Sequence, residues 1–186
     1  MLKIILFGDS ITAGYEDGVT DFRLNEEIEA NYPNCEVINA GIPGDTTRGA
    51  LSRLDAHVLK YQPDLVAVFF GANDVSNVIG INIEEYIINL KEIVNQIGYS
   101  KVILLGPPYA DQRIYSNERS LESIMAYNEA VRRIAESNKI TYVDVLESML
   151  KQEPLSYLQE DGLHFSRKGY QLLGQLINQE IKKKEG

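Results

Sequence analysis

Ser10 stands where a hydroxyl could act as a nucleophile, because it follows directly on the apolar run Leu2–Phe7 and the dipeptide Gly8-Asp9. A run of β-branched and aromatic residues that ends at a glycine predicts a buried strand that stops abruptly. A serine at the first turn after such a strand is held rigidly and still reaches solvent. It serves either as a helix cap or as a nucleophile, and its own pentapeptide fits both roles.

A serine nucleophile needs a base, and histidine is the usual one near neutral pH. His57 falls in the last turn of a helix expected over residues 46–60, where the helix dipole favours a surface histidine. His164 falls in a turn-like loop, three residues after Asp161. One local turn would bring this carboxylate against the imidazole, orient the ring and stabilise its protonated form.

The pair Asp161 and His164 also fits an ordinary loop, since Asp161-Gly162 is a common turn dipeptide. Taken together with Ser10, the pair becomes a candidate catalytic triad. The pattern G-x-S-x-G occurs nowhere in the chain, which excludes the nucleophile elbow of the α/β-hydrolase fold.

Three hydrogen-bond donors could stabilise the negative charge that develops on a carbonyl oxygen during acyl transfer. They are the backbone N–H groups of Ser10 and Gly41 and the side-chain amide of Asn73, each expected at the end of a neighbouring strand. Glycine at position 41 lets the chain approach a substrate closely. Asn73 equally suits an Asx-turn that caps the following loop.

Five apolar runs alternate with segments of helical periodicity, which predicts an α/β fold with a parallel sheet and helices on both faces. Four of the runs end in glycine with polar residues, and ligands of open parallel sheets bind outside these carboxyl ends. The chain has no repeat, low-complexity stretch or linker, so we expect one domain over residues 1–186. The runs are Leu2–Phe7, Glu36–Ala40, Leu65–Phe70, Val102–Leu105 and Ile140–Val145.

Helical periodicity is clearest in three later segments. Asn82 and Glu85 resemble a capping box ahead of an apolar stripe that stops at Gly98. Ser166 could cap the last helix. The other two expected apolar faces consist of Leu121, Ile124, Met125, Asn128, Val131 and Ala135, and of Tyr170, Leu173, Leu176 and Ile177.

The composition excludes several classes of function. The net charge is −9 at pH 7, whereas nucleic-acid binding relies on basic patches. No stretch approaches the ~18 apolar residues of a membrane span, and the first apolar run has no cleavage site after it. We therefore expect a cytoplasmic protein with no membrane span. With one cysteine and two histidines, we expect neither a disulfide nor a metal site.

Four short blocks resemble those of the GDSL/SGNH hydrolase family, in the family's order and at the predicted strand ends and closing loop. Together they span residues 8 to 164. Each block is weakly specific alone, and four in order are strongly specific. Ile11 stands where the family name has leucine, and both residues suit packing beneath the turn. The blocks are Gly8-Asp9-Ser10-Ile11, Asn39-Ala40-Gly41, Gly71-Ala72-Asn73-Asp74 and Asp161-Gly162-Leu163-His164.

The resemblance implies a three-layer α/β/α, flavodoxin-like fold with five parallel strands in the order 2-1-3-4-5. It implies Ser10 as nucleophile, His164 as general base and Asp161 as the acid that orients the base. It also implies an oxyanion hole made of Ser10, Gly41 and Asn73. The expected reaction is hydrolysis of small carboxylic esters through an acyl-enzyme, without a metal or organic cofactor. Within the family, the chain is similar to compact esterases of the isoamyl-acetate-hydrolysing type.

The same residues and composition also fit other functions. The same triad would serve a carbohydrate O-deacetylase or a thioesterase. An acidic chain with a five-stranded parallel sheet would also suit a non-catalytic, flavodoxin-like module that binds a phosphate or another anion. The loop 41–47 fits such a module poorly, because it has no lysine and no G-x-x-x-x-G-K-[ST] pattern.

The loop 107–120 is the longest stretch that follows a predicted strand. Tyr109 and Tyr115 in this loop could wall an acyl or alcohol pocket, and they equally suit an ordinary surface position in a chain that has eleven tyrosines. Val75, Asn77 and Phe165 are placed similarly, beside the blocks that carry the candidate catalytic groups.

Overall fold

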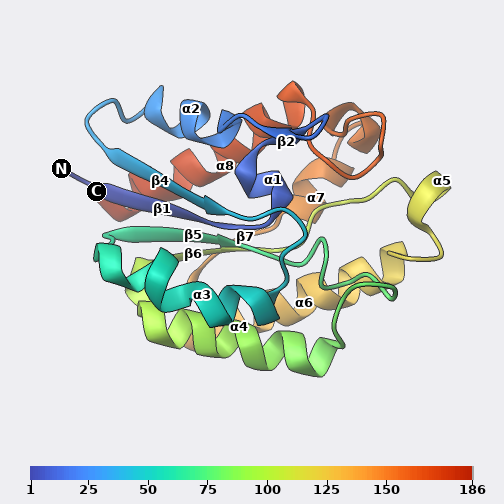
Figure 1. Ribbon diagram of the computed structural model, residues 1–186, viewed down its shortest axis with the longest axis horizontal. Coiled ribbons are helices and arrows are strands. Elements are labelled where there is room, and N and C mark those ends of the chain that lie inside the picture. Colours follow the sequence, from blue (N-terminus) through green and yellow to red (C-terminus); the bar gives the residue numbers. More distant parts are fainter. Residues whose placement is uncertain (186) are drawn as a thin grey trace.

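The computed structural model describes residues 1–185 and contains a five-stranded sheet in which all neighbouring strands are parallel (Figure 1). The strand order is β4-β1-β5-β6-β7. Counted among these five strands alone, the order reads 2-1-3-4-5, as predicted. The strands are β1 (Lys3–Gly8), β4 (Glu36–Gly41), β5 (Leu65–Phe69), β6 (Val102–Leu105) and β7 (Thr141–Val143).

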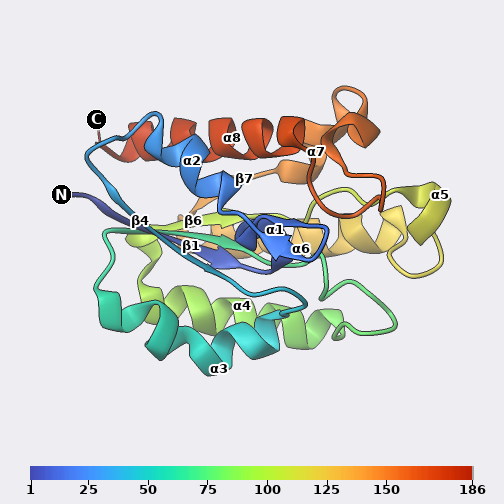
Figure 2. The same ribbon diagram turned by 45° about the horizontal axis from the view of Figure 1, so that its top comes forward.

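Helices cover both faces of the sheet, so the fold is the expected three-layer α/β/α arrangement. Figures 1 and 2 show α3, α4 and α6 on one side of the sheet and α2 and α8 on the other. The larger helices are α2 (Arg23–Glu29), α3 (Thr47–His57), α4 (Ile83–Ile97), α6 (Leu121–Asn138), α7 (Val145–Leu150) and α8 (Arg167–Glu185). The short elements are α1 (Ser10–Ala13), α5 (Gln112–Tyr115), the hairpin β2 (Tyr15–Glu16) and β3 (Val19–Thr20), and three 3₁₀ turns at Leu59–Tyr61, Tyr99–Lys101 and Pro154–Tyr157.

Two apolar clusters, one in each layer between sheet and helices, hold the fold together. Alternate residues of β1 enter opposite clusters: Ile5 and Phe7 pack toward α3 and α4, and Ile4 and Leu6 pack toward α2 and α8. Burial on both faces explains why the strands are apolar runs without clean alternation. None of the helices within residues 1–185 is long and apolar enough to cross a lipid bilayer.

Two predicted helix starts are confirmed and one predicted face is partly wrong. Asn82 Oδ1 accepts a hydrogen bond from the Glu85 N–H at 2.9 Å, and Ser166 Oγ accepts one from the Gly169 N–H at 3.2 Å. The Glu85 carboxylate binds Arg48 on α3, so the reciprocal half of the capping box is replaced by an ion pair. Met125 is 55% exposed, because it lies one position beyond the buried stripe of α6.

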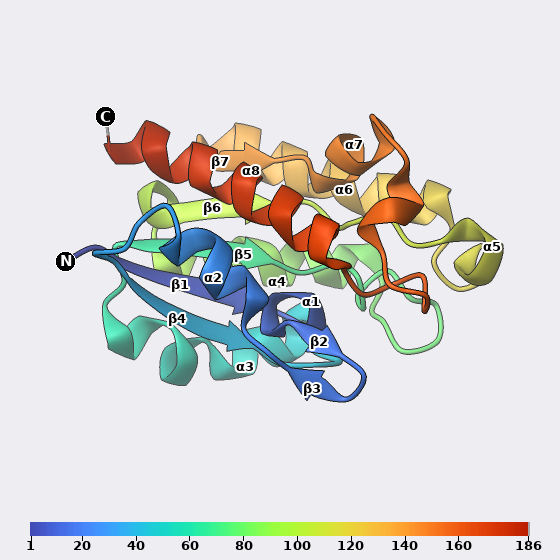
Figure 3. The same cartoon turned by 90° about the horizontal axis from the view of Figure 1, so that it is seen from above.

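The carboxyl ends of β1 and β4 pack closely against the turn that carries Ser10. Gly8 lies opposite Gly41 in the sheet, and α1 folds back over this end (Figure 3). A Cβ atom at position 41 would lie 2.4 Å from the backbone nitrogen of Ala13 and 2.8 Å from the carbonyl oxygen of Asp9. Position 41 therefore requires glycine, because only glycine allows the turn at residues 9–13 to pack this closely against the end of β4.

Replacing Gly41 with alanine should destabilise the protein by roughly 1–3 kcal/mol, because the added methyl group has to displace backbone atoms of α1. Chemical denaturation of the wild type and Gly41→Ala measures the free energy of unfolding. A variant as stable as the wild type would mean that the turn moves away from β4 without cost.

Candidate active site

Ser10 is the first residue of α1, directly beyond the carboxyl end of β1. Asp9 caps this four-residue helix, since its Oδ1 accepts a hydrogen bond from the Ile11 N–H at 2.9 Å. The helix ends at Gly14, whose φ of 78° lies in the left-handed region that favours glycine. The side chain that caps the turn is thus Asp9, which leaves the Ser10 hydroxyl free for another partner.

That partner is His164. Its Nε2 lies 2.9 Å from Ser10 Oγ, and its Nδ1 lies 2.6 Å from Asp161 Oδ2. Opposite a carboxylate, Nδ1 carries the proton and donates it, so Nε2 is the acceptor for the serine hydroxyl. The three predicted triad residues therefore form one hydrogen-bonded line. His57 lies on α3, where its ring nitrogen is 3.4 Å from Arg53 Nη1, and it takes no part in this line.

Asp161 is held as a carboxylate by its loop. Its Oδ1 accepts hydrogen bonds from the N–H groups of Leu163 and His164, at 2.9 and 3.0 Å. Partial burial on its own would raise the pKa of Asp161. The hydrogen bonds from the imidazole and from the two N–H groups outweigh burial and lower this pKa below its usual range. The acid therefore stays charged beside the ring that it orients.

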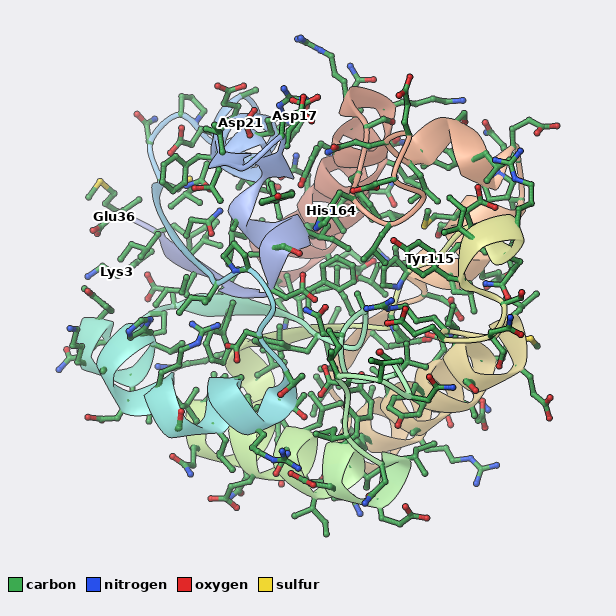
Figure 4. The ribbon with its side chains drawn as sticks, turned by 45° about the vertical axis from the view of Figure 1, so that its right-hand side comes forward. Lys3, Asp17, Asp21, Glu36, Tyr115 and His164 are labelled. Carbon is green, nitrogen blue, oxygen red and sulfur yellow. The ribbon has the colours of Figure 1, made fainter. Side chains whose placement is uncertain are left out.

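The His164 ring is also held from its side. The ring of Tyr15 packs on it, with centroids 4.5 Å apart. Gln159 holds the two chain segments that carry these rings. Its Nε2 donates to the carbonyl oxygens of Tyr15 and of Phe165, the residue after His164, each at 2.9 Å. Figure 4 shows His164 within this end of the molecule, with Lys3 and Glu36 at the opposite end of the sheet. Tyr15 was not anticipated from sequence, because nothing local links it to residue 164.

The N–H of Gly41 is not a free donor, which contradicts the prediction for this residue. It donates to Asn39 Oδ1 at 2.9 Å, while Asn39 Nδ2 donates to the Thr12 carbonyl at 2.8 Å. Asn39 thus ties β4 to α1 and uses the Gly41 N–H to do so. The role of Gly41 is the close packing described above.

Gly44, three residues later, has the properties that the prediction assigned to Gly41. It is exposed, its φ is 79°, and a Cβ there would meet open space. Within residues 1–185 its N–H donates to no acceptor, and the same holds for the N–H of Ser10. The dipeptide Pro43-Gly44 is the sequence signal for this turn.

The side chain of Asn73, four residues beyond the end of β5, is held by a hydrogen bond to the loop after β4. Its Nδ2 donates to the Asp45 carbonyl oxygen at 2.9 Å, which uses one of the two amide hydrogens. The residue is 5% exposed. Because Asp45 directly follows Gly44, this bond sets the Asn73 amide beside the turn that carries the free N–H.

The loop 107–120 contacts the loop that carries Asp161 and His164, and the substrate contacts of Tyr109 and Tyr115 stay a prediction. The Asp111 N–H donates to the Gly162 carbonyl at 2.8 Å, and Ile114 Cδ1 lies close to Gly162. The negative charge of Asp161 contributes to a raised pKa of Tyr115, although burial is the larger cause. Tyr109 is partly buried and packs against both apolar clusters.

Phe165 and Val75 were predicted to contact substrate, and the structure buries both. Phe165 is fully buried in the cluster beneath α8, where its ring lies against Phe69 and Tyr170. Val75 is 6% exposed and belongs to the cluster on the other face. The exposed Asn77 binds the neighbouring loop instead, since its Nδ2 donates to the Asn117 carbonyl. The prediction for Phe165 was wrong, because nearness in sequence does not reveal which way a side chain faces. The prediction for Val75 stays untested, since Ser10 and Asn73 are as little exposed as Val75.

Two buried carboxyl groups lie beneath the site. Burial is the chief cause that raises the pKa of Asp9 to about 7 and that of Asp74 to about 6. Within residues 1–185, neither carboxyl group forms a hydrogen bond or ion pair with a basic side chain. Asp74 Oδ1 accepts two hydrogen bonds from Thr47, whereas its Oδ2 has no partner in the described part of the chain. No three His, Cys, Asp or Glu side chains within residues 1–185 converge to hold a metal ion.

Asp9 should make the protein less stable as the pH rises from about 4 to about 7. Over this range the folded chain keeps a proton that the unfolded chain has already lost, so proton release favours unfolding. Asp9→Asn retains an acceptor for the Ile11 N–H and removes the titration. Thermal unfolding at about pH 5 and about pH 8 should show a smaller loss of stability for Asp9→Asn than for the wild type. Identical losses would contradict the raised pKa.

Known proteins are similar to this chain in sequence and in fold. The chain matches the family described as GDSL-like Lipase/Acylhydrolase over residues 6–172. It is similar to the crystal structure of the lipase/acylhydrolase from Enterococcus faecalis, with a TM-score of 0.94 and 41% identity over 98% of this chain and 96% of that one.

Curated relatives carry the names of ester hydrolases. The isoamyl acetate-hydrolyzing esterase of Saccharomyces cerevisiae is 29% identical over 91% of this chain and 82% of its own length. The acetylxylan esterase of Geobacillus stearothermophilus is 28% identical over 83% of this chain and 76% of its own length. With the family matched over nearly the whole chain, the protein belongs to the GDSL-like lipase/acylhydrolase family of ester hydrolases.

Proposed function

We propose that this protein is a serine esterase that hydrolyses small carboxylic esters through an acyl-enzyme on Ser10. The observation that carries the proposal is the hydrogen-bonded line from Ser10 Oγ through His164 to Asp161, with contacts of 2.9 and 2.6 Å. A neutral imidazole aimed at a hydroxyl, with a carboxylate behind it, is the arrangement of a nucleophile and its base.

Acylation begins when Ser10 Oγ attacks the ester carbonyl carbon and His164 Nε2 takes the hydroxyl proton. The imidazolium that forms is stabilised by Asp161, which remains a carboxylate. The tetrahedral intermediate collapses when the bond to the alcohol oxygen breaks, and His164 returns the proton to that oxygen. In deacylation His164 takes a proton from water as the water oxygen attacks the acyl carbon. The bond between the acyl carbon and Ser10 Oγ then breaks, His164 returns the proton to Oγ, and the carboxylic acid is released.

Three donors would receive the oxyanion. The first two are the Ser10 N–H and the second amide hydrogen of Asn73. We assign the third to the Gly44 N–H, which takes the place of the Gly41 N–H expected from sequence. This assignment is supported by the free state of the Gly44 N–H and by the hydrogen bond from Asn73 to the adjacent Asp45. Loss of one such donor typically lowers turnover by roughly 10²–10³.

Replacing Ser10 with alanine should lower turnover of p-nitrophenyl acetate by roughly 10³-fold or more, because the nucleophile is lost while the fold is retained. Ser52→Ala is the matched control, since Ser52 is an exposed serine on α3. Initial rates and a thermal unfolding curve for each protein measure the effect. Near wild-type turnover by a folded Ser10→Ala protein would reject the nucleophile.

A second candidate function is O-deacetylation of a carbohydrate. It is favoured by a cavity of about 710 Å³ beside the triad, whose walls are mostly polar and include Tyr15, Gln159, Asp161 and Arg167. Hydroxyl groups of a sugar would find hydrogen-bond partners in such a cavity. Exposed apolar residues on two loops, Val78 and Ile79 on one and Ile114 beside Gly162 on the other, suit an alkyl ester better.

Alkyl acetates should be better substrates than acetylated xylo-oligosaccharides if the exposed apolar loops receive the alcohol group. The kcat/KM values for a series of acetates, from ethyl to isoamyl and acetylated xylobiose, measure this preference. We expect kcat/KM to rise with alkyl length, by up to roughly tenfold per buried methylene pair. A clear preference for the sugar acetate would instead make the protein a carbohydrate deacetylase with the same triad.

A further inference from the structure

The side chain of Arg53 binds three separate segments that surround the candidate oxyanion hole. From α3, its Nη2 donates to the Gly8 carbonyl at 2.9 Å, its Nη1 to the Ala40 carbonyl at 2.7 Å, and its Nε to Asp45 Oδ2 at 2.7 Å. The side chain is 11% exposed, as is that of Asp45. All three nitrogens of one guanidinium are thus used, largely out of solvent.

Each of the three acceptors is joined to a group that the proposed mechanism uses. Gly8 lies two residues before Ser10, and its carbonyl also accepts the Ile42 N–H at 3.1 Å. Ala40 is the penultimate residue of β4, and the strand leads into the loop that carries Gly44. Asp45 follows Gly44 and holds Asn73 through its carbonyl oxygen at 2.9 Å. Arg53 therefore links the backbones that carry the three proposed donors, without itself contacting a donor group.

The geometry of this link requires arginine. The guanidinium is planar and presents N–H groups in several fixed directions, whereas a lysine ammonium is a point charge on a flexible stem. The carbon at the centre of the guanidinium lies 4.6 Å from the centroid of the Phe7 ring, which supports the group from one side. Asp45 Oδ1 also accepts the Thr46 N–H at 3.0 Å, so the carboxylate is fixed at both oxygens.

We propose that Arg53 is a positioning residue that sets the spacing of the oxyanion-hole donors. The proposal rests on the proposed esterase function. Arg53 acts through the Gly8 carbonyl, the Ala40 carbonyl and Asp45, and it touches neither substrate nor the reacting atoms. Its loss should therefore impair stabilisation of the transition state and leave substrate binding in the ground state nearly unchanged.

The first test compares Arg53→Lys with Arg48→Lys. Arg48 lies on the same helix and makes an ion pair with Glu85 at a largely exposed position, so it is the matched control. With p-nitrophenyl acetate, Arg53→Lys should lower kcat by roughly 10- to 100-fold with little change in KM, because small misplacements of catalytic groups cost rates of this order. Arg48→Lys should leave both constants unchanged.

A double-mutant cycle with Asn73→Ala separates positioning from a general structural effect. If Arg53 acts by placing the Asn73 amide and its neighbours, the substitution Arg53→Lys should cost much less in an Asn73→Ala background than in the wild type. A merely structural role would lower kcat by the same factor in both backgrounds. Equal factors would therefore overturn the proposal.

Asp45→Asn provides the same test from the other side of the ion pair, should Arg53→Lys fail to fold. It retains an acceptor for the Thr46 N–H and removes the carboxylate that fixes Arg53, so it should give the same loss of kcat at nearly constant KM. Wild-type kcat in any folded variant of this pair would overturn the proposal. If the wild type is no more active than Ser10→Ala, the proposed esterase function is wrong, and so is the role of Arg53. If the wild type is active and the Arg53 and Asp45 variants match it, only the role of Arg53 is wrong.

Discussion

The contact between Ser10 Oγ and His164 Nε2 joins side chains 154 positions apart, and the rest of the site is arranged around it. One partner stands on a four-residue helix at the end of β1, and the other on a loop that is closed by Asp161. A distance of 2.9 Å between such remote residues requires that both supports be rigid. Each support is held by hydrogen bonds from backbone N–H groups to a carboxyl oxygen. Asp9 accepts one in the first turn, and Asp161 accepts those of Leu163 and His164 in the second.

The hydrogen bonds at the carboxyl ends of the strands require carboxyl groups to be buried, which is electrostatically unfavourable. Asp9 and Asp74 are buried there, and their raised pKa values mark the unfavourable burial of charge. Arg53 and Asp45 form a largely buried ion pair in the same region, and Arg53 also donates to the backbone carbonyls of Ala40 and Gly8. Such polar groups stabilise a fold less than apolar side chains of the same size would, but they fix backbone atoms in definite places. The site depends on fixed backbone positions, because its donors must lie at hydrogen-bond distance from the oxyanion of the transition state rather than from the carbonyl oxygen of the bound substrate.

Sequence patterns predicted what local rules determine. The caps at Asn82 and Ser166 follow from turn residues and apolar periodicity. The strand order and the meeting of Ser10, His164 and Asp161 were implied by the resemblance of the four blocks to a known family. Gly41 was assigned the wrong role because a glycine after a strand can serve packing or donation equally, and only the contacts with Ala13 and Asn39 distinguish them. Phe165 and Val75 were placed at the site for nearness in sequence. The role of Arg53 could not be predicted from the sequence, because two of its partners are backbone carbonyl groups, which every residue type has.

The central claim is that Ser10 is the residue that becomes acylated. The most direct measurement is treatment of the protein with a fluorophosphonate, followed by mass spectrometry of its peptides. A phosphonyl group should appear on Ser10, and labelling should slow greatly in His164→Ala, which lacks the base. An unlabelled Ser10 in a protein that still hydrolyses esters, or a label carried by a different residue, would contradict the account.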